Sequence, residues 1–345
     1  MLQHVMLEVG GKFGDLRVIK ELGRGGMGAV YLVHNEATGA DFAAKILFPE
    51  AEIKNHDDAV GRFLREAEIA MTVDHPNVVK VYEVGRDPET RLGFMLMDYL
   101  PGGSLHDRLM ERLWLKKGPF RVDEAVRLVR QIADALVEAE RHGVVHRDIK
   151  PHNILFGADG LPRLSDLGIA KQAKLEKKTL TMTNMVVGTP AYMSPEQMMD
   201  SKHVDIRSDI YSLGIVLWQM LAGELPNADA SVAEMLRHAC QKDPIPDILL
   251  KRPKLPRAIV LLLRKMTSPS VETRFQHPQD ILDFLDNYAS RKRINWQVCV
   301  AGGALALAVV ALATALALRR SSAQDQNPKE PDQIRPLTLK RCSTK

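Results

Sequence analysis

The stretch His146–Asn153 reads HRDIKPHN and places a carboxylate, an ammonium group and an amide close together in the chain. Asp148, Lys150 and Asn153 carry these three groups at fixed offsets. Pro151 stands among them, and a proline suits neither the interior of a helix nor a central strand. The sequence therefore predicts a loop on which three polar side chains are presented.

These three groups match the needs of phosphoryl transfer. A carboxylate must accept or orient the proton of the attacking hydroxyl, a cation must meet the charge of the γ-phosphate, and an oxygen ligand must hold Mg²⁺. The stretch resembles the catalytic loop of protein kinases, HRDLxxxN, with Ile149 in place of the leucine. The resemblance implies Asp148 as the base, Lys150 as the γ-phosphate contact and Asn153 as a metal ligand.

A glycine-rich segment, Gly23–Val30, has the spacing G-x-G-x-x-G-x-V. Glycines let backbone N–H groups approach phosphates closely. Dinucleotide-binding folds share part of this spacing but continue into a helix, whereas Val30–Val33 reads VYLV and predicts a strand. The pattern favours a glycine-rich hairpin. The resemblance implies ATP contacts from Gly23, Arg24, Gly25, Gly26, Met27, Gly28 and Val30.

Lys45 is the one cation in the apolar run Phe42–Leu47, which predicts a strand. Such a lysine can be an ordinary strand-edge residue. In kinases, the lysine after the glycine loop holds the α- and β-phosphates and pairs with a glutamate of the next helix. The segment Gly61–Val73 has helical spacing and offers Glu66 and Glu68. They face different sides of a helix, and the family pattern selects Glu66.

The tripeptide Asp166-Leu167-Gly168 stands where kinases carry Asp-Phe-Gly. The resemblance implies that Asp166 binds the metal and that the protein uses ATP with Mg²⁺, or alternatively Mn²⁺. Leu167 departs from the family pattern, because leucine is a smaller apolar plug than phenylalanine. This change leaves metal binding intact and puts in doubt only the stability of a flipped, inactive state.

Downstream, Gly188–Glu196 reads GTPAYMSPE and resembles the end of a kinase activation segment, with Ser194 in place of an alanine. The resemblance implies that Glu196 pairs with Arg274 and that Asp209, on a later helix, braces the catalytic loop. These residues and Arg147 are expected to be structural. Deleting one partner of a buried ion pair is strongly destabilising.

The segment Thr179–Thr183 reads TLTMT and precedes that motif. By the resemblance, Thr181 and Thr183 fall where related bacterial kinases autophosphorylate, and Arg147 would receive the phosphate. A phosphate adds about 1.5 to 2 negative charges and can order a loop. The alternative, that these are ordinary loop threonines, stays open.

Substrate class also follows from the resemblance. Lys150 and Thr189 match the serine/threonine-kinase pattern, which implies protein substrates with Ser or Thr acceptors. One alternative is a membrane-tethered pseudokinase scaffold, but such proteins usually lose the lysine or an aspartate that this chain retains. Another is a small-molecule phosphotransferase, which the peptide-platform motif Gly188–Glu196 disfavours.

The motifs extend from about Phe13 to Tyr288. They imply an α+β, bilobal protein kinase fold over residues 13–288. A small β-rich N-lobe is expected at about 13–97 and a larger helical C-lobe at about 101–288. A helical stripe, with apolar residues three and four apart, is formed by Ala125, Leu128, Val129, Ile132 and Leu136.

Between the two lobes, the apolar strand Phe94–Met97 runs into Asp98-Tyr99-Leu100. This segment resembles the kinase hinge, at which the edge of adenine meets backbone groups. The resemblance implies that Asp98 and Leu100 contact ATP and that Met97 lines the pocket. A methionine at such a place is also an ordinary core residue.

Composition limits the other function classes. The formal net charge is only +4, which argues against a nucleic-acid partner. The three cysteines, Cys240, Cys299 and Cys342, form no C-x-x-C pair. Neither a disulfide framework nor a zinc site is therefore expected.

A second informative region is Val298–Leu318, whose 21 residues carry no charge. About 20 residues of helix span the ~30 Å of a bilayer's hydrocarbon core. A buried soluble helix is the alternative, but the polar residues 319–345 predict a short disordered tail and not a packing partner. The sequence predicts one C-terminal transmembrane helix at 298–318, after a basic juxtamembrane linker at 289–297.

Flanking charge does not orient this segment, because each side carries three cations within 15 residues. ATP use places the kinase domain in the cytoplasm, so a single-pass membrane protein with the tail outside is expected. Such a tail leaves no room for a folded sensor. Gly302 and Ala306 have a small-x-x-x-small spacing that could pair two helices in a homodimer, although alanine-rich helices show this spacing easily.

Overall fold

The computed structural model describes most of the first 290 residues and a short helical stretch beyond them. The described residues are 7–25, 28–47, 56–88, 92–167, 190–199, 204–228, 230–231, 234, 245–290, 307–308 and 310–315. The chain forms two compact units, Met1–Asp286 and Asn287–Lys345.

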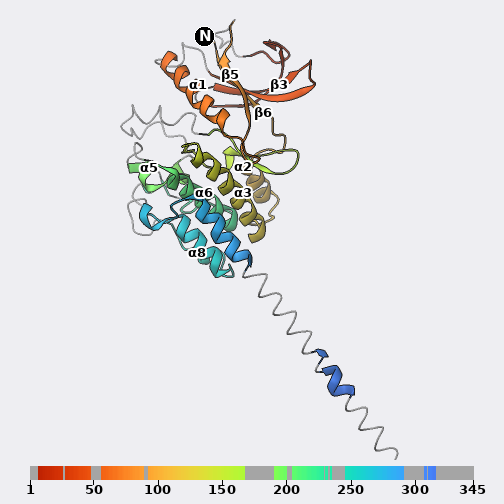
Figure 1. Cartoon of the computed structure of the whole chain (residues 1–345), viewed down its shortest axis with the longest axis vertical. Helices are drawn as coiled ribbons and strands as arrows, with labels where there is room; N and C mark the ends of the chain where they lie inside the picture. The colour runs from red at the N-terminus through yellow and green to blue at the C-terminus, as the bar shows by residue number, and fades with distance from the viewer. Residues whose placement is uncertain are drawn as a thin grey trace, which may run out of the picture. The chain divides into compact units, whose positions relative to one another are not determined.

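Six strands of the first unit form one antiparallel sheet in the order β1-β2-β3-β4-β6-β5. Figure 1 labels β3, β5 and β6 of this sheet. They are β1 Lys12–Phe13, β2 Leu16–Arg24, β3 Gly28–Asn35, β4 Ala40–Leu47, β5 Val81–Arg86 and β6 Gly93–Asp98. Apolar side chains that alternate along the strands, such as Tyr31 and Val33 of β3, meet Ala44 and Ile46 of β4 in one buried cluster. The prediction of a β-rich N-terminal part is confirmed.

One helix, α1 (His56–Thr72), packs against β5 and β6. Phe63, Ala67 and Ala70 are buried, which is the i, i+4, i+7 spacing of a helix with one apolar face. The helix begins at His56, five residues before the predicted segment. Charged residues such as Asp57 and Asp58 hid this first turn from a pattern based on apolar spacing.

Helices dominate the rest of the first unit (Figure 1). The α-helices are α2 Leu105–Trp114, α3 Val122–Arg141, α5 Pro195–Met199, α6 Ile206–Ala222 and α8 Arg257–Met266. A further helix, residues 278–290, starts in this unit and continues past its last residue, Asp286. Short 3-10 turns are Pro151–Asn153, Pro190–Tyr192, Ile248–Leu250 and Val271–Thr273, and a small hairpin pairs β7 Ile154–Phe156 with β8 Pro162–Leu164. The predicted apolar stripe of α3 is buried throughout.

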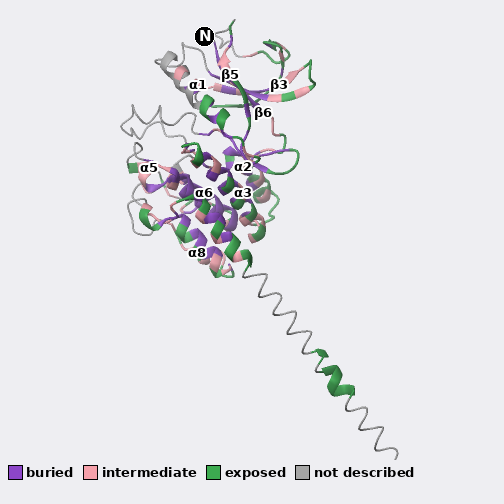
Figure 2. Ribbon diagram, viewed as in Figure 1, coloured by how far each residue is buried: buried purple, intermediate pink, exposed green. Residues whose placement is uncertain are grey.

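The centre of this helical part is α6, which is buried on all sides (Figure 2). Its first turn is capped by the side chain of Asp205, and Gly223 ends it in the left-handed conformation at φ +86°. Gly214 lets α8 approach closely, since a Cβ there would lie 2.6 Å from Cγ2 of Thr267. Asp209 therefore lies in the interior, beneath the segment that precedes β7.

In the second unit, residues 307–308 and 310–315 are helical, and Leu307, Val310 and Leu312 are exposed (Figure 2). The other residues of the predicted spanning segment, 298–318, lie outside the described part of the chain. No helix among the described residues combines the length and the apolar character that crossing a membrane requires.

Candidate active site

The segment that carries Asp148 is held in place by hydrogen bonds to Asp209. The backbone N–H groups of His146 and Arg147 donate to the two carboxylate oxygens of Asp209 at 2.7 and 2.8 Å. Burial raises the pKa of Asp209, and these N–H groups and the positive charge near them oppose that rise. Arg147 has a left-handed backbone with φ +63°, a conformation that costs a non-glycine residue about 1–3 kcal/mol. The two hydrogen bonds help to offset this cost.

The imidazole ring of His146 makes two hydrogen bonds, which together determine its tautomer. Its side chain is 1% exposed, Nε2 lies 2.8 Å from the carbonyl oxygen of Ser165, and Nδ1 lies 3.2 Å from the backbone N of Asp148. A carbonyl can only accept and an N–H can only donate, so Nε2 carries the proton and Nδ1 accepts. His146 thus joins the loop to the strand end that precedes Asp166.

Asp148, Lys150 and Asn153 lie together, as the sequence predicts for this loop. Nζ of Lys150 donates to Oδ2 of Asp148 at 2.8 Å. The amide of Asn153 donates to the same oxygen at 3.2 Å and to the backbone carbonyl of Asp148 at 2.8 Å. Pro151 opens the 3-10 turn that brings Asn153 back toward Asp148. One carboxylate is thereby fixed by two side chains from its own loop.

Lys45 and Asp166 are far apart in the sequence but form an ion pair. Nζ of Lys45, on β4, lies 2.6 Å from Oδ1 of Asp166, although the two residues are 121 positions apart. Burial opposes ionisation of Asp166, but the Lys45 ammonium group outweighs it and lowers the pKa of the carboxyl group. Asp166 has φ +58°, one of four left-handed non-glycine residues in the described chain. Two of those four, Arg147 and Asp166, belong to this site.

The predicted partner of Lys45 was Glu66. Its side chain lies outside the described part of the structure, so the Lys45–Glu66 pair stays a prediction. Glu68, the alternative, is exposed on α1. The pairing with Asp166 was not predicted, because no local pattern relates β4 to the chain after β8.

The glycine-rich segment is a hairpin between β2 and β3, and a strand follows it, as predicted. The N–H of Gly25 donates to the carbonyl of Gly28 at 2.9 Å. Gly28 has a structural reason to be glycine, since a Cβ there would lie 2.1 Å from the carbonyl oxygen of Ile46 on β4. The structure places Gly23 and Arg24 at the end of β2 and Val30 in β3. Gly26 and Met27 lie outside the described residues.

The predicted hinge follows β6. The N–H of Asp98 donates to the carbonyl of Lys80 at 3.0 Å, and its Oδ1 accepts from the hydroxyl of Tyr82 at 2.7 Å. That hydrogen bond raises the pKa of Tyr82 to about 12. Met97 is buried opposite Ala43, and Leu100 is half-buried beyond the strand end.

Glu196 and Arg274 meet as the sequence predicts. Nη1 of Arg274 lies 2.7 Å from Oε1 of Glu196, and Nη2 lies 3.1 Å from Oε2. The side chain of Arg274 is fully buried, and it also donates to the carbonyls of Ser268 and Arg207. Burial opposes ionisation of Glu196, but Arg274 outweighs it and lowers the pKa of the carboxyl group.

Ser194 and Gln197, on either side of Pro195-Glu196, have roles that the motif alone does not predict. Ser194 and Gln197 form a capping box at the start of α5, in which each side chain meets the other's backbone N–H, at 3.4 and 3.0 Å. Gln197 also donates to the carbonyl of Arg147 at 3.0 Å. The S-x-x-Q spacing was the available signal. The capping box gives a physical reason for Ser194 at a position where the family has alanine.

Several predicted residues lie outside the described part of the chain: Gly168, Thr181, Thr183 and Thr189. Leu167 is buried, as an apolar plug should be. Among the described residues, no group of three or more His, Cys, Asp or Glu side chains could hold a metal.

Residues 16–300 match the family model of the protein kinase domain. A probable serine/threonine-protein kinase PknB of Lactococcus lactis is 34% identical over 280 residues, which are 80% of this chain and 42% of that protein. The serine/threonine-protein kinase PrkC of Bacillus subtilis is 34% identical over 271 residues, 78% of this chain and 39% of that protein. The chain thus spans about two fifths of the length of these relatives.

Solved structures agree with the sequence relatives. The kinase domain of Mycobacterium tuberculosis PknI superposes with a TM-score of 0.63 at 26% identity, covering 83% of this chain and all of that domain. The bilobal architecture, the order of motifs and these likenesses have one explanation. The chain belongs to the protein kinase family and is related to its bacterial serine/threonine kinases.

Proposed function

We propose that the chain transfers the γ-phosphate of ATP to serine and threonine hydroxyls of proteins. The observation that supports this most strongly is the convergence of five groups from three segments of the chain. Lys45 meets Asp166 at 2.6 Å, and Asn153 and Lys150 both meet Asp148. These are the cations, carboxylates and amide that phosphoryl transfer requires.

Each group then has a role. Asp148 accepts or orients the proton of the incoming hydroxyl, and Lys150 balances charge on the γ-phosphate. Lys45 holds the α- and β-phosphates beneath the N–H groups of the β2–β3 hairpin. The chain around Asp98 and Leu100 meets the edge of adenine. Asp209 and Arg147 keep the loop in its shape.

Protein kinases use ATP with a divalent metal, and the residues here fit Mg²⁺. Asn153 offers an amide oxygen and Asp166 a carboxylate whose lowered pKa keeps it ionised. Mg²⁺ prefers oxygen ligands and usually takes one or two from the protein and the rest from phosphates and water. When bound, it would neutralise negative charge on the transferred phosphate. Mn²⁺ suits the same donors.

The test is incubation of the full chain with ATP, Mg²⁺ and a generic protein substrate, followed by phosphoamino-acid analysis. We expect phosphoserine and phosphothreonine but no phosphotyrosine, and no product when EDTA removes the metal. A chain that binds nucleotide but modifies nothing would instead be a pseudokinase scaffold. Phosphorylation of a small molecule but not of protein would favour the phosphotransferase alternative.

The kinase domain is proposed to occupy residues 13–288, with lobes at about 13–97 and 101–288. Residues 289–297 would be a basic linker, 298–318 a transmembrane helix and 319–345 a disordered tail. The uncharged sequence of 298–318 supports this, as does the exposure of Leu307, Val310 and Leu312 on their helix. Use of ATP places the kinase domain on the cytoplasmic side, and Gly302 and Ala306 would be the contact in a homodimer.

Membrane extraction tests this anchor. We expect the full chain to stay in the membrane fraction after alkaline carbonate washing and to enter solution only with detergent. A variant with Val309→Arg and Leu312→Arg should become extractable by carbonate, because charges at the centre of a membrane span are costly. Release of the unmodified chain by carbonate alone would contradict the proposed anchor.

Thr181 and Thr183 are proposed as autophosphorylation sites, with Arg147 as the receiver of the phosphate. We expect the double variant Thr181→Ala, Thr183→Ala to lose most activity toward a protein substrate and to match the phosphatase-treated native chain. The measurement is the rate of phosphate incorporation before and after phosphatase treatment. Full activity of the variant after that treatment would exclude the proposal.

A further inference from the structure

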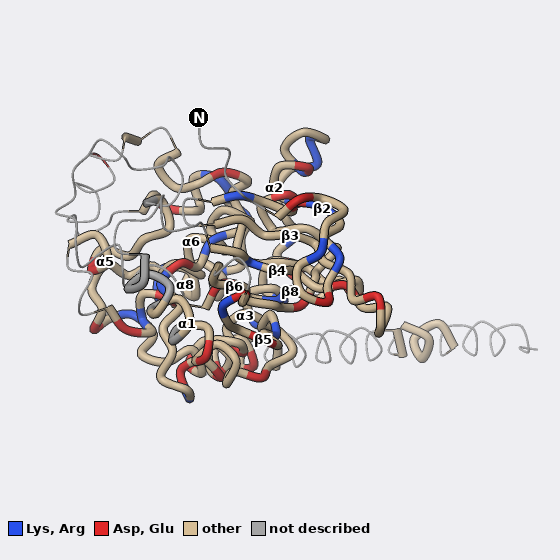
Figure 3. The backbone as a smooth tube through the Cα atoms, turned by 90° about the horizontal axis from the view of Figure 1, so that it is seen from above, with Lys and Arg blue, Asp and Glu red and all other residues tan. Residues whose placement is uncertain are grey.

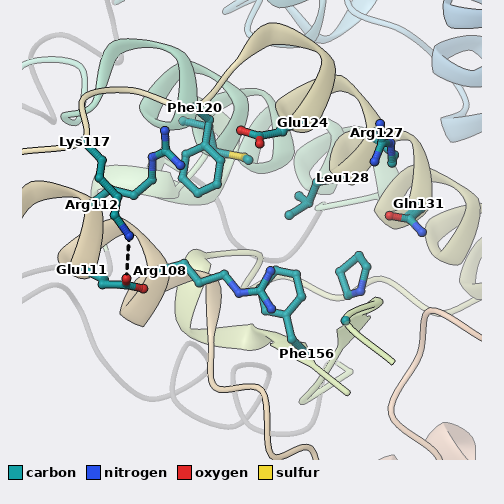
Figure 4. Close-up of a pocket in the computed structure, with 13 residues that line it drawn as sticks. Arg108, Glu111, Arg112, Lys117, Phe120, Glu124, Arg127, Leu128, Gln131 and Phe156 are labelled. Atoms are coloured by element: carbon teal, nitrogen blue, oxygen red, sulfur yellow. Dashed lines mark hydrogen bonds and ion pairs between the residues drawn. The ribbon is translucent and has the colours of Figure 1, made fainter. Parts of the chain in front are cut away.

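A hollow of about 360 Å³ lies on the helical part of the first unit (Figure 4). Its walls come from α2, α3, the β7–β8 hairpin, the connection between α2 and α3, and Met220 of α6. Lys45, Asp148 and Asp166 do not line it, so it is separate from the candidate active site.

Charged side chains line this hollow, with four cations and two carboxylates: Arg108, Arg112, Lys117, Arg127, Glu111 and Glu124. Both carboxylates already have partners. Glu111 accepts from Nζ of Lys117 at 2.9 Å, as the dashed line in Figure 4 marks. Glu124 accepts from the backbone N–H of Arg121 at 3.2 Å. The hollow therefore keeps an excess of positive charge.

Arg112 has partners as well. Its guanidinium group donates to the carbonyls of Gly118 and Pro119 at 3.0 and 2.9 Å, and it lies 4.4 Å from the ring centre of Phe120. These bonds hold the α2–α3 connection against α2. Arg112 therefore shapes the wall of the hollow.

Arg108 differs from these residues. Its guanidinium carbon lies 3.2 Å above the ring centre of Phe156 (Figure 4), and the guanidinium group makes no hydrogen bond or ion pair with any described residue. Burial lowers the pKa of Arg108, with Glu111 opposing. A stacked guanidinium keeps its N–H edge available for a planar acceptor such as a carboxylate. Arg127 of α3 is likewise without a described partner and lines the same hollow.

Apolar surface adjoins these arginines. Leu128, Phe120 and Phe156 contribute to the walls, and a second hollow of about 310 Å³ shares Arg112 and Phe120 with the first. Leu113 lines the second hollow, and next to it Trp114 is 88% exposed. Two hollows that share residues suit an extended chain better than a compact anion, and an exposed tryptophan is a common anchor in protein interfaces.

We propose that this pair of hollows is a docking groove for an acidic, partly apolar segment of a protein substrate. A carboxylate of that segment would bind Arg108 and Arg127, and its apolar side chains would contact Phe120, Leu113 and Trp114. Elsewhere along the described chain, acidic and basic residues are interspersed (Figure 3). Because four cations line the groove and both of its carboxylates have partners, the groove offers a local positive surface. The inference rests on the proposed function, since it concerns how that site obtains its substrates.

Peptide binding to the full chain in detergent tests the groove. The probe is a fluorescein-labelled peptide of alternating Glu and Leu, measured by fluorescence anisotropy against matched peptides with Gln or Lys in place of Glu. We expect the acidic peptide alone to bind, with affinity falling as salt rises. The double variant Arg108→Gln, Arg127→Gln should bind it about tenfold or more weakly. Arg141→Gln, an exposed α3 cation paired with Glu138, should bind normally.

Three results would overturn the proposal. They are equal binding by the double variant, equal binding of the Gln peptide, and displacement of the peptide by inorganic phosphate at constant ionic strength, which would assign the site to a small anion. Binding needs no phosphoryl transfer, so the same titration on the Asp148→Asn chain separates failure of the groove from failure of the kinase. With an active chain, the double variant should raise KM for dephosphorylated casein and leave kcat unchanged.

Discussion

Asp148→Asn should lower kcat for phosphorylation of a protein substrate by about 10² to 10⁴-fold, the usual contribution of a positioned base. Asparagine keeps the size of the side chain and can still accept hydrogen bonds from Lys150 and Asn153, which lie 2.8 and 3.2 Å from Oδ2 of Asp148. It cannot take or orient a proton as a carboxylate does. Because Asp148 is not expected to contact adenine, the affinity for ATP should change little.

The measurement is a steady-state rate at saturating ATP and protein substrate, together with a nucleotide-binding titration. Asp159→Asn is the matched control, since Asp159 lies in the β7–β8 turn and pairs with Arg163 at 2.7 Å on the surface. The control should retain native kcat. Unchanged kcat in Asp148→Asn would remove Asp148 from the proposed mechanism.

Arg274→Met should lower the free energy of unfolding by about 3–5 kcal/mol. The substitution keeps much of the apolar volume but leaves the largely buried Glu196 carboxylate, 20% exposed, without its cation. The carbonyls of Ser268 and Arg207 also lose their donor. The measurement is chemical denaturation, followed by a signal that reports the helical part of the first unit.

Arg264→Met provides the control, because Arg264 is 62% exposed in its ion pair with Asp247. A surface pair contributes only about 0–1 kcal/mol. A double variant, Glu196→Leu with Arg274→Met, should regain much of the lost stability, since no unpaired charge remains. Equal losses in Arg274→Met and Arg264→Met would contradict the buried-pair interpretation.

The same pair gives a pH dependence of stability. The pKa of Glu196 in the folded chain lies below its ordinary value of 4.5. A lowered folded pKa means that the stabilisation is present above 4.5 and is lost as pH falls toward the folded value. The difference in unfolding free energy between the native chain and Arg274→Met should therefore shrink below pH 4.5.

Much of the fold follows from local pattern and from motif order. The β2–β3 hairpin was predicted because a strand pattern follows the glycines, and the stripe on α3 because its apolar residues recur at helical spacing. Both signals lie within a short window of sequence. The start of α1 was missed for the same reason, since its first turn is polar.

The candidate site was predicted as a set of residues, and the family resemblance supplied only some of its contacts, such as the Glu196–Arg274 pair. The Lys45–Asp166 pair joins positions 121 residues apart, and no local pattern encodes such a distance. The left-handed backbones of Arg147 and Asp166 were equally hidden, because neither residue is glycine. Tertiary hydrogen bonds, such as those that the loop N–H groups donate to Asp209, stabilise conformations that local preference disfavours. The excess of positive charge near Arg108 was likewise not predictable, because it depends on the contacts that Glu111 and Glu124 make in the folded chain.

The most direct test of the central claim, γ-phosphoryl transfer through the Asp148 loop, uses two labels in parallel. The full chain is incubated with Mg²⁺, a protein substrate and ATP labelled at either the γ- or the α-phosphate. We predict that γ-label enters serine and threonine of the protein, that α-label does not, and that Asp148→Asn loses the γ-signal. Incorporation of α-label instead, or of neither label by a chain that binds ATP, would contradict it.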